Sequence, residues 1–130
     1  MRSIIFISAA ALSVASCTDQ PVAPGDTANF ARELAGRVVS GPPQSCVATM
    51  QSTNLRVIDG QTLAYDQGAT VWVNRLAARC PAIEPLNTVI VEPKLGTQYC
   101  RGDHIRGLEP GAIIPGPTCF LGEWVPYRRP

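Results

Sequence analysis

Histidine is almost absent from this chain, since His104 is the one histidine among 130 residues. Any mechanism that needs a histidine base would run through His104, and Asp103 beside it would point to the opposite face of a strand. No two cysteines stand in a C-x-x-C pattern, so the ligand spacing typical of zinc sites is also absent. We therefore expect no catalytic set and no metal, and we interpret His104 as a surface residue.

An excess of one charge sign is missing as well. Eleven basic and ten acidic residues give a formal net charge of +1, which argues against a nucleic-acid partner or a polybasic membrane-surface protein. No phosphate-binding loop or nucleotide fingerprint occurs, so we expect no cofactor. The carboxylates that could pair for acid–base chemistry are better explained as turn or surface residues; they are Asp59, Asp66, Asp103 and Glu123.

Long apolar runs are lacking, and the longest covers residues 4–14. About 20 residues are needed to span a membrane, so this run fits the core of a signal peptide instead. Arg2 precedes it, and Ala15 and Ser16 lead directly to Cys17. This pattern predicts a bacterial lipoprotein signal over residues 1–16, with Cys17 as the lipidated N-terminus.

The residues after Cys17 extend that prediction. Several acyl chains on Cys17 would hold the protein stably on a membrane, and residues 17–26, which contain proline and glycine, read as a flexible tether. Thr18 follows the cysteine in place of aspartate, which favours the outer membrane of a Gram-negative cell, facing the periplasm. We expect residues 27–130 to form a single domain.

The other four cysteines predict two disulfides, since an even number in an exported domain is typical of a disulfide framework. They are Cys46, Cys80, Cys100 and Cys119. Four cysteines allow three pairings, and the sequence alone does not select one. We favour Cys80–Cys100, which closes a short loop, together with Cys46–Cys119, which joins the two ends of the domain. Each bridge would contribute about 2–4 kcal/mol.

The clearest structural pattern is a three-stranded meander. Residues 55–58 are apolar and β-branched, and the Asp59-Gly60 pair that follows is a strong hairpin motif. Residues 61–65 and 70–74 then alternate apolar and polar side chains on either side of a second turn. We expect these three segments to pair in order as an antiparallel sheet.

The remaining segments complete a mainly β domain. We expect a short helix over residues 27–36, a helical turn over 75–79, an irregular Pro/Gly-rich loop over 109–117 and a tail over 127–130. Further strands are expected over residues 88–92, 98–100, 103–108 and 119–125. The predicted fold is all-β, a small antiparallel β-barrel or sandwich with one short N-terminal helix and two disulfides.

Five short pieces between Cys46 and Tyr127 resemble a family of unknown function, made of small exported domains and lipoproteins from alphaproteobacteria and their relatives. The resemblance implies an exported, disulfide-bearing domain and supplies no activity and no functional residues. The pieces are Val57-Ile58-Asp59, Trp72-Val73-Asn74-Arg75-Leu76, Cys80-Pro81, Tyr99-Cys100-Arg101-Gly102-Asp103 and Cys119-Phe120-Leu121-Gly122.

Aromatic side chains are scarce, at 6% of residues, and they dominate interface hot spots. We therefore predict Trp72, Trp124 and Tyr127 as contact residues, with core packing as the alternative; the two near the C-terminus are expected to be partly exposed. The function expected from these features is a non-enzymatic envelope lipoprotein that binds another envelope component. An inhibitor of a periplasmic enzyme, acting through the loop over residues 109–117, is one form of it.

Two other functions stay open. A binder of a small amphiphilic ligand would need a pocket lined by Tyr65, Trp72 and Phe120, and a hydrolase would be centred on His104. A set of arginines could form an anion-binding patch but is more often a solvated face; it comprises Arg75, Arg79, Arg101 and Arg106.

Overall fold

The computed structural model describes residues 24–50 and 55–130, with side chains from residue 28 onward within those ranges. The predicted signal peptide, the lipidation site Cys17 and most of the tether therefore lie outside the described residues. Within the described part, no helix is long and apolar enough to cross a membrane.

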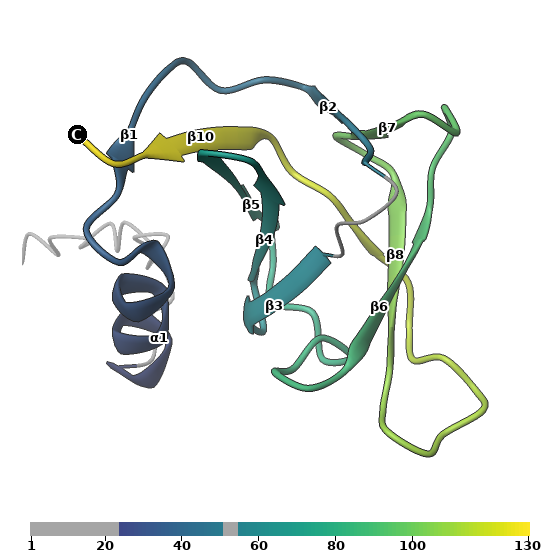
Figure 1. Ribbon diagram of the computed structural model, residues 1–130. Helices are drawn as coiled ribbons and strands as arrows, with labels where there is room; N and C mark the ends of the chain where they lie inside the picture. Colours follow the sequence, from purple (N-terminus) through teal and green to yellow (C-terminus); the bar gives the residue numbers. More distant parts are fainter. Residues whose placement is uncertain (1–23, 51–54) are drawn as a thin grey trace, which may run out of the picture.

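The described chain is mainly β with one short helix, as predicted. That helix, α1 (Pro24–Leu34), begins within the predicted tether and ends two residues before the predicted end at residue 36. Three antiparallel sheets are present, in the orders β1-β10-β5-β4-β3, β2-β7 and β6-β8-β9. They pack against one another in a sandwich-like arrangement and do not close into a barrel (Figure 1). The strands are β1 (Val38–Val39), β2 (Cys46–Ala48), β3 (Leu55–Asp59), β4 (Thr62–Gln67), β5 (Thr70–Arg75), β6 (Thr88–Glu92), β7 (Gln98–Cys100), β8 (His104–Leu108), β9 (Cys119–Phe120) and β10 (Trp124–Arg128).

The predicted meander is confirmed as β3, β4 and β5. At its first turn the backbone N–H of Gln61 donates to the Asp59 carboxylate over 2.8 Å, which is the local bond that makes aspartate a turn residue. Strand β4 has apolar neighbours on both faces, because Leu63 and Tyr65 join the core between the sheets while Ala64 faces α1. Residues 62–65 of β4 are therefore all buried.

Trp124 and Tyr65 fill the main core together with Ile83 and Ile105. The Trp124 ring is fully buried and lies edge-on to Tyr65, with 6.4 Å between the ring centroids. The prediction of Trp124 as a partly exposed contact residue is therefore wrong. Trp124 begins β10, which pairs with β5 opposite Asn74, so that its side chain enters the core.

Helix α1 covers the other face of the five-stranded sheet (Figure 1). Its Leu34 is buried, and its Phe30 lies edge-on to Tyr127 at 6.2 Å. Arg56 on β3 pairs with Glu33 of the helix and forms two bonds of 2.9 and 3.0 Å to Asp66 on β4. The helix is thus docked on the domain, a point that the sequence left open because so short a helix is marginal on its own.

The four cysteines form two disulfides, as predicted, but the favoured pairing is wrong. Cys46 bonds to Cys100, and Cys80 bonds to Cys119. Cys46 and Cys100 lie directly opposite each other in the β2–β7 pair. The sequence did not indicate β2 as a strand, because its three residues follow a Pro-rich segment. The prediction therefore lacked the register that places these cysteines together.

Two other segments differ from expectation. Residues 75–79 do not form a helical turn: the N–H groups of Leu76 and Cys80 donate to the carbonyls of Gln61 and Gly60, so this segment wraps over the first hairpin turn. Residues 127 and 128 belong to β10 and do not form a tail, because β10 gains β1 as a second partner. Strand β1 has only two residues, which is too short for a sequence pattern.

Candidate functional site

His104 stands on the surface at the start of β8, as predicted. Its Nδ1 lies 3.8 Å from a carboxylate oxygen of Glu92, the residue opposite it on β6, and its ring is edge-on to Phe120 at 5.0 Å. Exposed ion pairs of this kind contribute little to stability. Within the described residues, no hydrogen bond joins His104 to a serine or threonine hydroxyl, and the cysteines Cys46, Cys80, Cys100 and Cys119 form disulfides.

Asp103 is fully buried and serves the β7–β8 turn. One carboxylate oxygen accepts the N–H of Cys100 over 2.7 Å, and the other accepts the N–H of Lys94 over 3.2 Å. The side chain therefore holds two backbone segments beside the Cys46–Cys100 bridge. This arrangement is structural, because both oxygens of the Asp103 carboxylate accept backbone N–H groups.

Replacing Asp103 with asparagine is expected to lower the free energy of unfolding by about 1–3 kcal/mol, because one buried backbone N–H loses its acceptor. The exposed neighbour provides a matched control, since His104→Gln should change it by less than about 0.5 kcal/mol. Urea denaturation followed by tryptophan fluorescence measures both. Equal losses in the two variants would show that Asp103 does not hold the turn.

The other predicted carboxylates and arginines are distributed among separate local contacts. Arg75 lies 5.8 Å from the Phe30 ring, Arg101 pairs with Glu123 at 3.2 Å, and Arg106 donates to a backbone carbonyl in the 109–117 loop. Arg79 is exposed and packs against Gly60. Arginines with such different neighbours support the interpretation of ordinary surface charge.

Tyr65 and Trp72, which were predicted to line a ligand pocket, lie opposite each other in the β4–β5 pair, but Phe120 does not join them. Tyr65 is fully buried, with its ring between Tyr99 and Trp124. Trp72 is half-buried and donates its indole N–H to Gln67, whereas Phe120 is exposed on β9 in a different sheet. Burial, followed by the neighbouring Tyr65, raises the pKa of Tyr99 above its usual value of 10.0, as expected for a phenol packed into the core.

The loop of residues 109–117 stands out from the body of the domain. It connects β8 to β9 and projects beyond the end of the sheet (Figure 1). Ile113 and Ile114 are 91% and 79% exposed, and the Ala112 N–H donates to the Glu109 carbonyl within the loop. These two adjacent isoleucines form an apolar tip on the loop, and exposed apolar patches are a common feature of interaction sites.

The base of this loop is clamped. The Gly116 N–H donates to the Gly107 carbonyl over 2.8 Å, and the Arg106 Nε–H donates to the Gly116 carbonyl over 3.0 Å. Three residues beyond Gly116, the bridge from Cys119 to Cys80 ties the returning chain to the neighbouring segment. The position of the loop is therefore fixed at its base by covalent and hydrogen bonds.

Close packing of Ala82 on the loop base requires glycine at two positions. A Cβ on Gly107 would lie 1.6 Å from the Ala82 carbonyl oxygen, and one on Gly116 would lie 2.4 Å from the Ala82 Cβ. Both approaches are too close for any side chain. Residues 81 and 82 are therefore pressed against the base of the loop.

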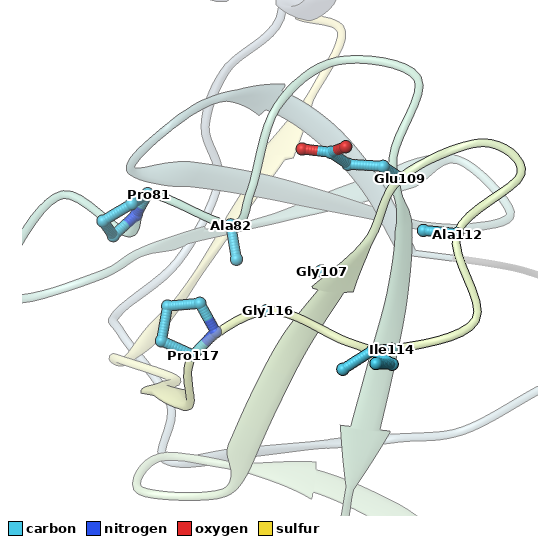
Figure 2. A pocket seen from close by; sticks show the side chains of 8 residues that line it. All are labelled: Pro81, Ala82, Gly107, Glu109, Ala112, Ile114, Gly116 and Pro117. Carbon is cyan, nitrogen blue, oxygen red and sulfur yellow. The ribbon is translucent and has the colours of Figure 1, made fainter.

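A pocket of about 300 Å³ lies between that segment and the loop (Figure 2). Glu109 is the one charged residue that lines it, and the figure shows the Glu109 side chain reaching from the loop toward Pro81 and Ala82. The other lining residues are apolar or glycine: Pro81, Ala82, Gly107, Ala112, Ile114, Gly116 and Pro117.

The sequence singled out this loop but not the exposed side chains that make it a candidate site. The rule that aromatic residues dominate interfaces points to Trp72, Trp124 and Tyr127, and it does not indicate Ile113, Ile114 or Glu109. The pattern that could have revealed them is an Ile-Ile pair inside a segment otherwise composed of proline, glycine, alanine and one glutamate. Such a pair has no strand or helix in which to bury itself.

Among residues 28–50 and 55–130, no group of three or more histidine, cysteine or acidic side chains is placed to hold a metal ion. The chain matches no protein-family model, and it shows no significant similarity to a curated protein or a solved structure. The resemblance to a family of small exported domains stays a prediction.

Proposed function

We propose that this protein is a non-enzymatic, lipid-anchored component of the cell envelope that binds another envelope protein through the 109–117 loop. The observation that carries the proposal is the exposed pair Ile113 and Ile114 on a loop whose base is clamped. The partner would offer an apolar cleft to the two isoleucines. A periplasmic hydrolase inhibited by the inserted loop is the form of partner that best suits a single protruding segment.

The energetics favour a protein cleft as the target. Burying an isoleucine side chain contributes about 1.5–3 kcal/mol, so the pair could supply a large share of the binding free energy. A loop already held at its base loses little conformational entropy when it binds. Pro110, Pro115 and Pro117 restrict the backbone further. These features together support a preorganised binding element.

The leader supports the cellular placement. A signal ending at Cys17 and a short tether before α1 would hold the domain near a membrane while leaving the loop free. The near-neutral charge of the chain is consistent with a partner that is recognised by apolar contacts.

A photo-reactive amino acid at position 113 tests the proposal in intact cells. We expect one abundant protein adduct from position 113. The same residue at position 95 should not yield it, since Leu95 is 56% exposed and apolar but lies in the turn between β6 and β7. Identical adducts from the two positions, or adducts with lipid alone, would contradict a specific protein partner.

Replacing both isoleucines, as Ile113→Ser with Ile114→Ser, is expected to weaken binding to that partner about 100-fold, because about 3 kcal/mol of apolar burial is lost. The fold should persist, since both side chains are exposed. Calorimetric titration of the purified partner measures the effect, with Leu95→Ser as the control that keeps the original affinity. Unchanged affinity in the double variant would remove the loop from the interface.

A further inference from the structure

The pocket beside the loop has a shape that is already set before any partner arrives. Its floor contains Gly107 and Gly116, joined by a hydrogen bond of 2.8 Å. Its far wall, Pro81 and Ala82, follows directly after the bridged Cys80, and the Asn87 side chain donates to the Ala82 carbonyl over 3.1 Å. The floor and the far wall are therefore each held in place by bonds within the protein.

The size of the pocket limits what can enter it. About 300 Å³ is at the lower end of the range for small-molecule sites, about 300–1,000 Å³. A single long side chain fits such a space better than a cofactor does. Ile114 contributes to the pocket wall and is also one of the two exposed isoleucines, so a chain covering the isoleucines would pass directly over the opening.

The chemistry of the lining selects the kind of side chain. Prolines, alanines and Ile114 provide apolar surface, and the Glu109 carboxylate provides one negative charge. No ion pair or hydrogen bond joins this carboxylate to another side chain within the described residues. Arg106, on the strand β8 that leads into Glu109, already donates its Nε–H to the Gly116 carbonyl.

We propose that this pocket receives a lysine or arginine side chain of the partner, with Glu109 as its counter-ion. Such side chains lay a methylene stem along apolar surface and keep the charged head at the rim, and a charged hydrogen bond to a carboxylate strengthens the contact. This inference rests on the proposed function, because it names the chemistry of the partner segment that lies beside the inserted isoleucines.

A small probe tests the pocket without the partner. n-Butylguanidinium, titrated into the protein purified in detergent, should shift the amide NMR signals of Ile114 and Gly116 saturably, whereas butyrate should not. Glu109→Gln is expected to weaken probe binding about fivefold, as an exposed charge pair does. Glu84→Gln is the matched control, since Glu84 is exposed and does not line the pocket; it should leave binding unchanged.

Charge reversal provides a second variant, because Glu109→Lys should bind butyrate in place of n-butylguanidinium. Equal binding of both probes to the original protein, no saturable shift, or unchanged binding in Glu109→Gln would overturn the inference.

Failure of this inference is distinguishable from failure of the proposed function. If the pocket does not bind the probe but the serine variants of Ile113 and Ile114 lose the partner, the pocket inference is wrong and the loop proposal stands. If the pocket binds the probe but those variants keep the partner, the loop proposal is wrong and only probe binding by the pocket is supported.

Discussion

Replacing Trp124 with alanine is expected to lower the free energy of unfolding by about 3–5 kcal/mol, which is the usual cost of truncating a large buried ring. The ring has no exposed surface and packs on Tyr65 within the core that joins the sheets. Its backbone also exchanges two hydrogen bonds of 2.8 Å with Gln44. Urea denaturation followed by far-ultraviolet circular dichroism measures the loss without relying on tryptophan fluorescence.

The matched variant is Trp124→Phe. Among the described residues, the buried indole N–H of Trp124 has no hydrogen-bond partner, and such a group carries a cost of about 1–3 kcal/mol. Phenylalanine removes that cost while keeping an aromatic ring, so the loss should be below about 1.5 kcal/mol. A loss as large as that of the alanine variant would show that the indole N–H is satisfied. A small loss in both variants would show that Trp124 is outside the core.

Removing the Cys80–Cys119 bridge, as Cys80→Ala with Cys119→Ala, is expected to lower the free energy of unfolding by about 2–4 kcal/mol. The two cysteines are 39 residues apart in the sequence, and a closed loop of that size restricts the unfolded chain strongly. The same change releases one end of the clamp on the 109–117 loop. We therefore expect weaker binding to the partner in addition to lower stability.

The second bridge distinguishes these two effects. Cys46 and Cys100 are 54 residues apart and join β2 to β7, so Cys46→Ala with Cys100→Ala should cost a similar amount of stability. Its effect on partner binding should be much smaller, because neither cysteine lies at the base of the loop. Equal losses of affinity in the two double variants, at a temperature where both remain folded, would show that the Cys80–Cys119 bridge has no special role in presenting the loop.

The parts of the fold that the sequence predicted are those encoded locally. The Asp59-Gly60 turn and the alternation on either side of it specify β3 to β5 within a short stretch of chain. The pairing of β10 with β1, and the placement of Cys46 opposite Cys100, depend on residues far apart in the sequence. Strands of two or three residues have too few positions for alternation to be visible, so these long-range pairings were missed.

The candidate site was predictable in its location and not in its chemistry. Proline and glycine marked residues 109–117 as an irregular loop, because neither residue suits the interior of a strand. The pocket beside Glu109 forms only when Ala82 packs against Gly107 and Gly116. The exposure of Ile113 and Ile114 depends on which distant segments pack near the loop. The prediction that Trp124 is partly exposed was wrong for a similar reason. The position of a residue near the chain end does not show which face of a sheet its side chain occupies.

The central claim is that an anchored domain presents Ile113 to a protein of the envelope. Photo-cross-linking from position 113 in intact cells, compared between the natural chain and its Cys17→Ser variant, tests this claim most directly. We predict one abundant protein adduct in the natural chain and a strong decrease when Cys17 is replaced, because the loop is then no longer held beside its partner. An adduct of equal yield in both chains would contradict the role of the anchor, and the absence of any protein adduct would contradict the binding function.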